Sequence, residues 1–297
     1  MKPLRSLPRR LAAALLPEPQ LRVLRTFWHR SQALDPRRLW LRRAFRRLNA
    51  GAAPDEIVLR PGLRLAIDSQ AREPFEWFCF RSPEMVAELD GFLSRVEGRR
   101  RLLDVGACHG LFSLAFTQGR PEAEALAVEP SPLAWDVLEA NVRRNADARV
   151  TPLRAAVGAE PGVLRMRFSW HHLEASPEST DDPDTISIPL RTLDDIREEQ
   201  MFRPDVMKVD VEGYEIFALR GARRILGEDR PLLFLEAHPR RLQELGGSMK
   251  ELWDLLAGAG YRALDLHGSP VGAGAFATQD SISRFYFLPG TAPKRRT

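Results

Sequence analysis

The segment Arg101-Leu-Leu-Asp-Val-Gly-Ala-Cys-His-Gly-Leu-Phe-Ser113 decides the fold of this chain. Its apolar start predicts a buried strand, and the apolar residues Leu111 to Phe116 predict a helix. The small residues between them predict a tight turn. A strand that enters a helix in this way begins a βαβ unit, so we expect further strands and helices to lie beside it.

The glycines in the turn limit which ligand it can hold. Gly106 and Gly110 allow the backbone to approach a ligand that a side chain would push away. The dinucleotide pattern G-x-G-x-x-G would need glycine where this chain has Cys108 and Leu111, so that fingerprint is absent. The pattern here is Asp-x-Gly-x-x-x-Gly, which begins at Asp104. We expect Gly106→Val to abolish cofactor binding and to leave the fold mostly intact.

A second acid, Glu129, ends the next apolar strand, Ala125 to Val128. An ionised carboxylate only accepts hydrogen bonds, which suits the two hydroxyls of a ribose. The acid, the glycine turn and the distal acid together suggest S-adenosylmethionine, an adenosine with a cationic sulfonium and no pyrophosphate. Asp104 could instead be a structural cap for the turn amides.

With two later stretches, these motifs resemble the FkbM-type methyltransferase family over roughly Leu102 to Pro239. The matching stretches are Leu103 to Ser113; Glu129-Pro-Ser-Pro132 with Leu138 and Asn141; Arg191-Thr-Leu-Asp-Asp195; and Met207-Lys-Val-Asp-Val-Glu-Gly-Tyr-Glu215 with Leu219, Gly221 and Ala222. The resemblance implies a class I methyltransferase, Rossmann-like fold and an O-methyltransferase acting on a hydroxyl of a sugar or natural-product scaffold. The cofactor-binding residues that we predict are Asp104, Gly106, Ala107, Gly110, Ser113, Glu129, Pro130, Ser131 and Asp210.

Composition and charge set the wider limits. With 297 residues and 44% hydrophobic content the chain can form one large α/β domain with an appendage. No apolar run is long enough to span a membrane, and the apolar run Leu11 to Leu16 is too short for a secretory signal, so we expect a cytoplasmic protein. Two cysteines cannot make a metal framework. Met1 to Ala50 contain 13 Lys or Arg and 2 acids, whereas the remainder contains 31 and 38. This basic arm could bind an anionic partner or membrane surface, or pack on its own body.

Periodicity divides the chain into four parts. We expect a basic helical extension over 1–54, a hairpin and helix over 55–98, the methyltransferase domain over 99–290, and a basic tail over 291–297. Strands that alternate with helices predict a doubly wound, mostly parallel sheet. The sequence also predicts a loop over Ser169 to Thr185, a helix over Tyr214 to Leu226, and a cluster formed by Phe75, Trp77, Phe78 and Phe80. We interpret that aromatic cluster as core in preference to an acceptor wall.

The catalytic candidates follow the predicted strands. Ligands of open α/β sheets gather at the carboxyl ends of the strands, which here carry Asp210, Glu212, Glu236 and His238. Lys208, Asp210 and Glu212 alternate along one strand, and we expect Lys208 to pair structurally with a carboxylate. A hydroxyl acceptor needs a base, for which His238 or Glu236 is our choice, with Asp210 shaping the methyl site. His238 could instead only hold its loop in place.

Three alternatives remain open. We assign no metal site, although the same four catalytic candidates could ligate a divalent cation. The acceptor could be a nitrogen of nucleic acid or protein instead of a small molecule or glycan, as the basic arm suggests. The chain could also be a non-catalytic module that only binds the cofactor.

Overall fold

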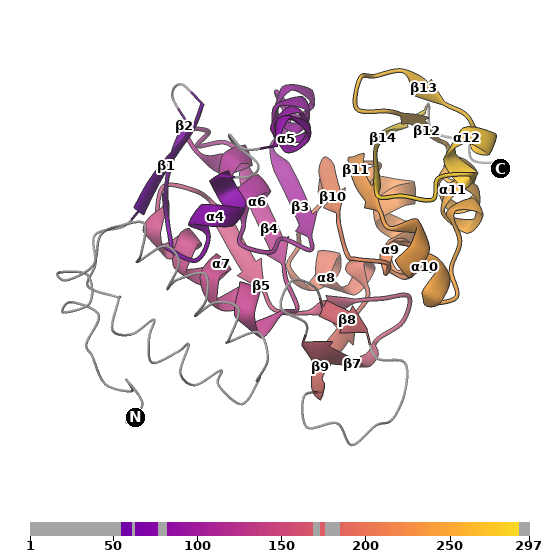
Figure 1. Cartoon of the computed structure of the whole chain (residues 1–297), viewed down its shortest axis with the longest axis horizontal. Coiled ribbons are helices and arrows are strands. Elements are labelled where there is room, and N and C mark those ends of the chain that lie inside the picture. The colour runs from indigo at the N-terminus through magenta and orange to yellow at the C-terminus, as the bar shows by residue number, and fades with distance from the viewer. Residues whose placement is uncertain (1–54, 61–62, 77–81, 169–172, 176–184, 291–297) are drawn as a thin grey trace, which may run out of the picture.

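The computed structural model describes residues 55–60, 63–76, 82–168, 173–175 and 185–290. At its centre lies an eight-stranded sheet in the spatial order β13-β12-β14-β11-β10-β3-β4-β5 (Figure 1). In chain order the strands of this sheet are β3 (Arg101–Val105), β4 (Glu124–Val128), β5 (Val150–Leu153), β10 (Val206–Val209), β11 (Leu232–Ala237), β12 (Tyr261–Leu264), β13 (Pro270–Val271) and β14 (Ser283–Pro289).

The direction of the strands confirms the doubly wound, mostly parallel sheet. From β5 to β11 every neighbouring pair is parallel, and β14 is antiparallel to both β11 and β12. The chain winds outward from β3 in one direction and from β10 in the other, so the strand order reverses between them. This reversal is where ligands collect in open α/β sheets. β5 is the edge strand, which explains how it tolerates Pro152.

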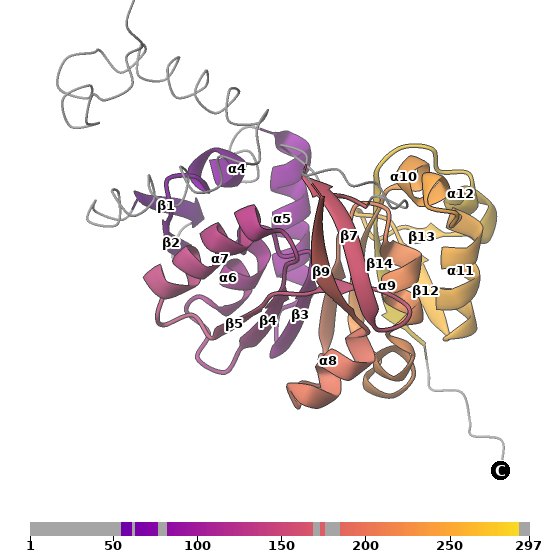
Figure 2. The same cartoon turned by 90° about the horizontal axis from the view of Figure 1, so that it is seen from below.

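Alternate residues of the strands fill two separate cores, one on each face of the sheet. Figure 2 shows the helices that pack around this sheet. Leu102 and Val206 belong to the core under α5 (Pro83–Arg95), α6 (Leu111–Thr117) and α7 (Pro132–Arg144). Leu103 and Met207 belong to the other core. The helices of that second face are α8 (Leu193–Glu199), α9 (Glu215–Arg220), α10 (Pro239–Glu244), α11 (Met249–Gly258) and α12 (Ala273–Ala277).

The predicted hairpin is present as β1 (Asp55–Arg60) and β2 (Leu63–Ile67), which pair antiparallel. A short helix that the sequence did not predict, α4 (Arg72–Glu76), follows it. Phe75 of this helix is buried in the first core, which fits the interpretation of the aromatic cluster as core. The other three aromatic residues of that cluster, and the predicted extension and tail, lie outside the described residues.

Two predicted elements are divided in the structure. The strand expected over Val150 to Ala156 ends at Leu153, and the chain then enters a second sheet of order β6-β9-β7-β8. The strands of this sheet are β6 (Ala156–Val157), β7 (Gly162–Phe168), β8 (Leu173–Ala175) and β9 (Thr185–Arg191). β8 lies inside the stretch expected to be a loop, so that prediction was wrong at residues 173–175.

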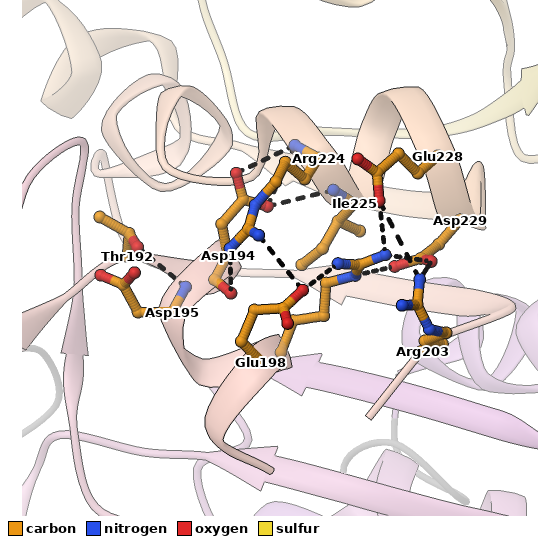
Figure 3. Close-up of polar contacts among 10 residues, drawn as sticks. Thr192, Asp194, Asp195, Glu198, Arg203, Arg224, Ile225, Glu228 and Asp229 are labelled. Carbon is orange, nitrogen blue, oxygen red and sulfur yellow. Dashed lines mark hydrogen bonds and ion pairs between the residues drawn. The ribbon is translucent and has the colours of Figure 1, made fainter. Parts of the chain in front are cut away.

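The helix expected over Tyr214 to Leu226 is also divided. It forms α9 and a π-helical turn, η3 (Ile225–Asp229), separated at Gly221. A Cβ atom at Gly221 would lie 2.1 Å from the carbonyl oxygen of Gly158, so a tertiary contact ends the helix there. A network of ion pairs joins η3 to α8 (Figure 3). No helix within the described ranges has the length and apolar character needed to cross a membrane.

Candidate functional site

The turn after β3 is shaped by left-handed backbone conformations at Gly106 (φ 82°), Cys108 (φ 49°) and Gly110 (φ 85°). The amides of Gly106 and Ala107 both donate to the carbonyl oxygen of Val128, at 2.9 and 3.0 Å. These bonds attach the turn to the end of β4. The turn is therefore fixed by its own backbone contacts before any ligand binds.

The two glycines are required by contacts within the protein. A Cβ atom at Gly106 would lie 1.8 Å from the carbonyl oxygen of Asp210, and one at Gly110 would lie 2.6 Å from Cδ1 of Leu138. The expectation that Gly106→Val leaves the fold mostly intact is therefore wrong. Backbone approach to a ligand does not by itself explain the glycine at position 106.

Glu129 connects the turn to the start of α7. Its Oε2 accepts a hydrogen bond from the Cys108 amide at 2.8 Å, and its Oε1 accepts one from the Ser131 amide at 2.7 Å. Ser131 in turn is the N-cap of α7, and Pro130 stands between the two. Burial raises the pKa of Glu129 to about 7, although the two amides oppose the shift. Each carboxylate oxygen still has capacity to accept one more hydrogen bond.

Asp104 is buried at the end of β3. Its Oδ2 accepts a hydrogen bond from the Ser113 hydroxyl at 2.7 Å, whereas Oδ1 has no hydrogen-bond partner among the described residues. Burial raises the pKa of Asp104, and the nearby Lys208 ammonium opposes this shift. The hydrogen bonds described for this carboxyl go to the side chain and backbone of Ser113 in the first turn of α6 and not to the amides of the turn after β3, so Asp104 does not cap that turn.

Lys208 lies inside β10 beside Asp104. Its side chain pairs with a carboxylate, as the sequence predicted. Lys208 Nζ is 3.2 Å from Asp210 Oδ2 and 4.8 Å from the centre of the Phe112 ring. Burial lowers its pKa, but the carboxylates of Asp210 and Asp104 raise it further, so the net direction is upward. The buried ammonium therefore stays charged and partly neutralises the acids around it.

Asp210 and Glu212 lie beyond the end of β10, because that strand stops at Val209 and not at Val211 as expected. Glu212 has φ 51° and Gly213 has φ 100°, a left-handed pair that turns the chain sharply into α9. The Glu212 side chain is one-third exposed, and its Oε2 is 3.3 Å from Nε2 of His238. Both acids therefore lie at the open end of the strand, as the sequence predicted.

His238 is buried between carboxylates at the end of β11. Its Nδ1 is 2.7 Å from Oε1 of Glu215, and its Nε2 faces Glu212 and, at 3.7 Å, Oε1 of Glu236. Burial alone would lower the pKa of His238, but the bond to Glu215 and the neighbouring acids raise it to about 9. The surroundings therefore favour the protonated ring, which cannot accept a proton. His238 as a base remains a prediction with this argument against it.

Glu236 forms a two-bond pair with Arg284 of β14. Arg284 Nε and Nη2 donate to its two oxygens at 3.0 and 3.1 Å, and the same Nε lies 2.6 Å from Oε2 of Glu88 on α5. Burial and the Asp210 carboxylate raise the pKa of Glu236 to about 7, and burial raises the pKa of Glu88 to about 8. Arg284 opposes both shifts.

The structure brings the catalytic candidates together. One ligand atom each from Asp210, Glu236 and His238 lie within 4.8 Å of one another, and we call these three residues the triad. The triad adjoins the turn, because the Asp210 amide donates to Val105 at 3.0 Å and its carbonyl oxygen lies against Gly106. The predicted cofactor residues and the predicted catalytic residues therefore form one continuous site at the point where the strand order reverses.

Sequence reasoning missed three buried charged residues around the triad: Glu215, Glu88 and Arg284. The sequence could have indicated Glu215, because this residue is the last of the motif Met207 to Glu215 and the first of α9. Glu88 lies on the face of α5 that also carries Leu89 and Phe92, where an acid is unexpected. Asn141 also supports the site, because its Nδ2 donates to the carbonyl oxygen of His109 at 2.8 Å.

The fold and the site define the class. A doubly wound sheet in which the antiparallel strand β14 is inserted between β11 and β12, and which has an acid–glycine turn at its centre, is the class I methyltransferase architecture. The family model described as "Methyltransferase FkbM domain" matches residues 104–263, which is more than half of the chain. The chain therefore belongs to the FkbM methyltransferase family.

Individual relatives are more distant. The protein "Methyltransferase sdnD" of Sordaria araneosa is 28% identical over a match of 153 residues, and the match covers 40% of this chain and 59% of that protein. Methyltransferase FkbM from Methylobacillus flagellatus KT is 20% identical, with a TM-score of 0.43, and the match covers 72% of this chain and 52% of that one. Aeropyrum pernix fibrillarin, in complex with natively bound S-adenosyl-L-methionine, is 14% identical with a TM-score of 0.41 and covers 69% and 74%. The matched stretch is thus little more than half of the first two proteins.

Proposed function

We propose that this chain transfers a methyl group from S-adenosylmethionine to a hydroxyl oxygen of a sugar or natural-product scaffold. One observation carries the proposal. The acid–glycine turn that suits the cofactor directly adjoins the triad, through the contact of Asp210 with Gly106 and Val105. A methyl donor and a group that can take a proton from the acceptor would therefore meet in one place.

The residues of the turn fit this cofactor. Glu129 has one unused acceptor position on each oxygen for the two ribose hydroxyls. Asp104 has a buried oxygen to which none of the described residues donates a hydrogen bond, and this oxygen can receive a donor from the methionine part. The bound cofactor would supply an electrophilic methyl group on a positively charged sulfur. The carboxylates that surround the turn favour that positive charge.

The triad favours a hydroxyl acceptor over an amine. A hydroxyl is a poor nucleophile until a base removes its proton, and a positioned base contributes about 10² to 10⁴ in rate. Glu236, whose pKa is raised to about 7, suits this role better than a protonated His238. Glu212, the remaining catalytic candidate, contacts His238 at the open end of the site, and Asp210 would border the methyl group, as the sequence predicted.

The ribose contact predicts a pH dependence of cofactor binding. The Glu129 pKa of about 7 means that this carboxyl must lose a proton on binding at lower pH, because two hydroxyl donors require the ionised form. Affinity should therefore fall below pH 7, by up to about tenfold per unit, and level off above it. Calorimetry between pH 5.5 and 8.5 measures this directly. The Glu129→Gln variant should bind the cofactor more weakly and should lose the fall in affinity below pH 7. Identical pH profiles for the two proteins would show that Glu129 does not bind the ribose.

A labelled-methyl assay tests the proposed reaction. The chain is incubated with methyl-labelled cofactor and separate panels of sugars and polyols, structured RNA, and peptides. We expect label only in the hydroxyl panel. Glu236→Gln should lower that turnover by about a hundredfold or more without changing cofactor affinity. Glu97→Gln, at an exposed position outside the site, is the matched control and should keep full turnover.

Two results would contradict the proposal. Label on RNA or peptide nitrogen, lost when Met1 to Ala50 are deleted, would favour the alternative acceptor class that the basic arm suggests. Cofactor binding without transfer to any panel would favour a non-catalytic binding module. Each result identifies a different function for the same turn.

A further inference from the structure

His238 is held in the arrangement that proteins use for metal-binding histidines. A ligating imidazole usually gives its other ring N–H to a carboxylate, which fixes the tautomer and the direction of the free nitrogen. Here Nδ1 lies 2.7 Å from Oε1 of the fully buried Glu215, so Nε2 is directed at the other acids. Glu215 itself is not one of the groups that Nε2 faces. It belongs to α9, whereas His238 follows β11.

The ligand atoms converge at nearly the required spacing. The three atoms of the triad lie within 4.8 Å of one another. Two ligand atoms of one octahedral divalent ion are about 3.0 Å apart when they are adjacent and about 4.2 Å apart when they are opposite, because each bond is about 2.1 Å long. Closing the triad on an ion therefore needs movements of about an ångström or less. Asp210 is partly exposed beyond its strand and can make such a movement.

The charge of the surroundings also calls for a cation. Four acids with buried side chains lie around Asp210 and His238: Glu88, Asp104, Glu215 and Glu236. The cationic partners that the described residues give these acids are Lys208, Arg284 and the protonated His238, whose ring proton an ion on Nε2 would replace. Three of the four acids, Glu88, Asp104 and Glu215, keep a buried oxygen with no hydrogen bond among the described residues. Buried carboxylates that exceed their cationic partners are costly unless another positive charge joins them. A doubly charged ion between the triad atoms would supply that charge.

We infer that Asp210, Glu236 and His238 form a binding site for a divalent cation of the Mn²⁺ type. Two carboxylate oxygens and one imidazole nitrogen are the mixed, mostly oxygen donor set that such ions accept. This inference rests on the proposed function for its role. An ion there would bind the acceptor hydroxyl and lower its pKa, and Glu212 would then be the carboxylate placed to take the proton.

Binding of Mn²⁺ alone, without cofactor or acceptor, tests the site. The full chain is treated with chelator, and Mn²⁺ is titrated while the electron paramagnetic resonance signal of the free ion is recorded. We expect one ion per chain. Asp210→Asn and His238→Gln should each weaken binding at least tenfold. Glu215→Gln, which removes the charge that orients the histidine, should weaken it by about tenfold. Asp147→Asn and His267→Gln, at exposed positions outside the site, should bind as the parent does.

The outcomes separate this inference from the proposed function. Mn²⁺ binding that depends on the triad, without methyl transfer, would support the site and contradict the function. Methyl transfer that survives chelation, together with no saturable Mn²⁺ binding, would overturn the site and leave the function standing. Equal binding by the parent and His238→Gln would also overturn it. Circular dichroism and melting curves exclude variants that fail to fold, and Asp210→Asn, at a partly exposed position, provides the test if the buried variant does not fold.

Discussion

Replacing Gly106 by alanine should remove measurable cofactor binding and lower the free energy of unfolding by about 2 to 5 kcal/mol. Two costs add at this position. A residue with a Cβ atom loses about 1 to 2 kcal/mol in the left-handed conformation that the φ of 82° imposes. The new atom would also meet the carbonyl oxygen of Asp210 at 1.8 Å, and such overpacking typically costs about 1 to 3 kcal/mol.

The loss of binding follows from where that collision occurs. The clash can be relieved only by separating the turn from the segment that carries Asp210, because the Cβ atom is held rigidly by its own backbone and the oxygen that it meets is a backbone atom. That movement would displace the cofactor turn and the triad together. Urea unfolding measures the first effect and calorimetry with S-adenosylmethionine measures the second.

Gly119 provides a matched control. Its φ is 71°, and a Cβ atom there would meet nothing within 4 Å. Gly119→Ala should therefore lose only the conformational cost of about 1 to 2 kcal/mol and should bind the cofactor normally. Equal destabilisation by Gly106→Ala and Gly119→Ala would show that the contact with Asp210 is unimportant for stability. Normal cofactor binding by Gly106→Ala would show that the turn is not part of the cofactor pocket.

The sequence predicted those parts of the site that depend on local patterns. Asp104, Gly106 and Glu129 were recognisable because each stands at a fixed distance from the end of an apolar strand, and parallel strands bring their ends to the same edge. The approach of Asp210, Glu236 and His238 to one another followed from the same rule. Their roles did not follow, because the protonation state of His238 depends on Glu215 and Glu212, whose positions are set by a left-handed turn.

The remaining errors have tertiary causes. Arg284 and Glu88 come from elements nearly 200 residues apart in the chain, and nothing in their neighbours predicts that they meet over Glu236. The helix after Tyr214 was predicted too long because the helical spacing of its apolar residues continues past Gly221. The structure ends the helix at that glycine, which contacts Gly158. The second sheet was missed as a separate layer because strand period does not indicate which partner a strand will pair with.

The second large effect concerns the ion pairs between α8 and η3 (Figure 3). Arg197→Met should lower the free energy of unfolding by about 3 to 5 kcal/mol, because it leaves the buried acid Asp229 without its buried partner. The Arg197 side chain is 2% exposed, and Asp229, which it contacts through Nη2 at 2.8 Å and through Nε, is 5% exposed. Glu198 and Glu228 complete the set of acids around this guanidinium.

Arg203 is the matched control, because it contacts the same acid from the surface. Its Nη1 is 3.3 Å from Oδ1 of Asp229, but its side chain is 63% exposed, so Arg203→Met should cost no more than about 1 kcal/mol. Arg197→Met combined with Asp229→Leu should recover much of the lost stability, because the uncompensated charge is then removed with its partner. Urea unfolding of the four proteins gives the comparison. Similar losses for Arg197→Met and Arg203→Met, or no recovery in the double variant, would mean that packing of η3 on α8, and not the buried charge pair, holds this edge of the domain together.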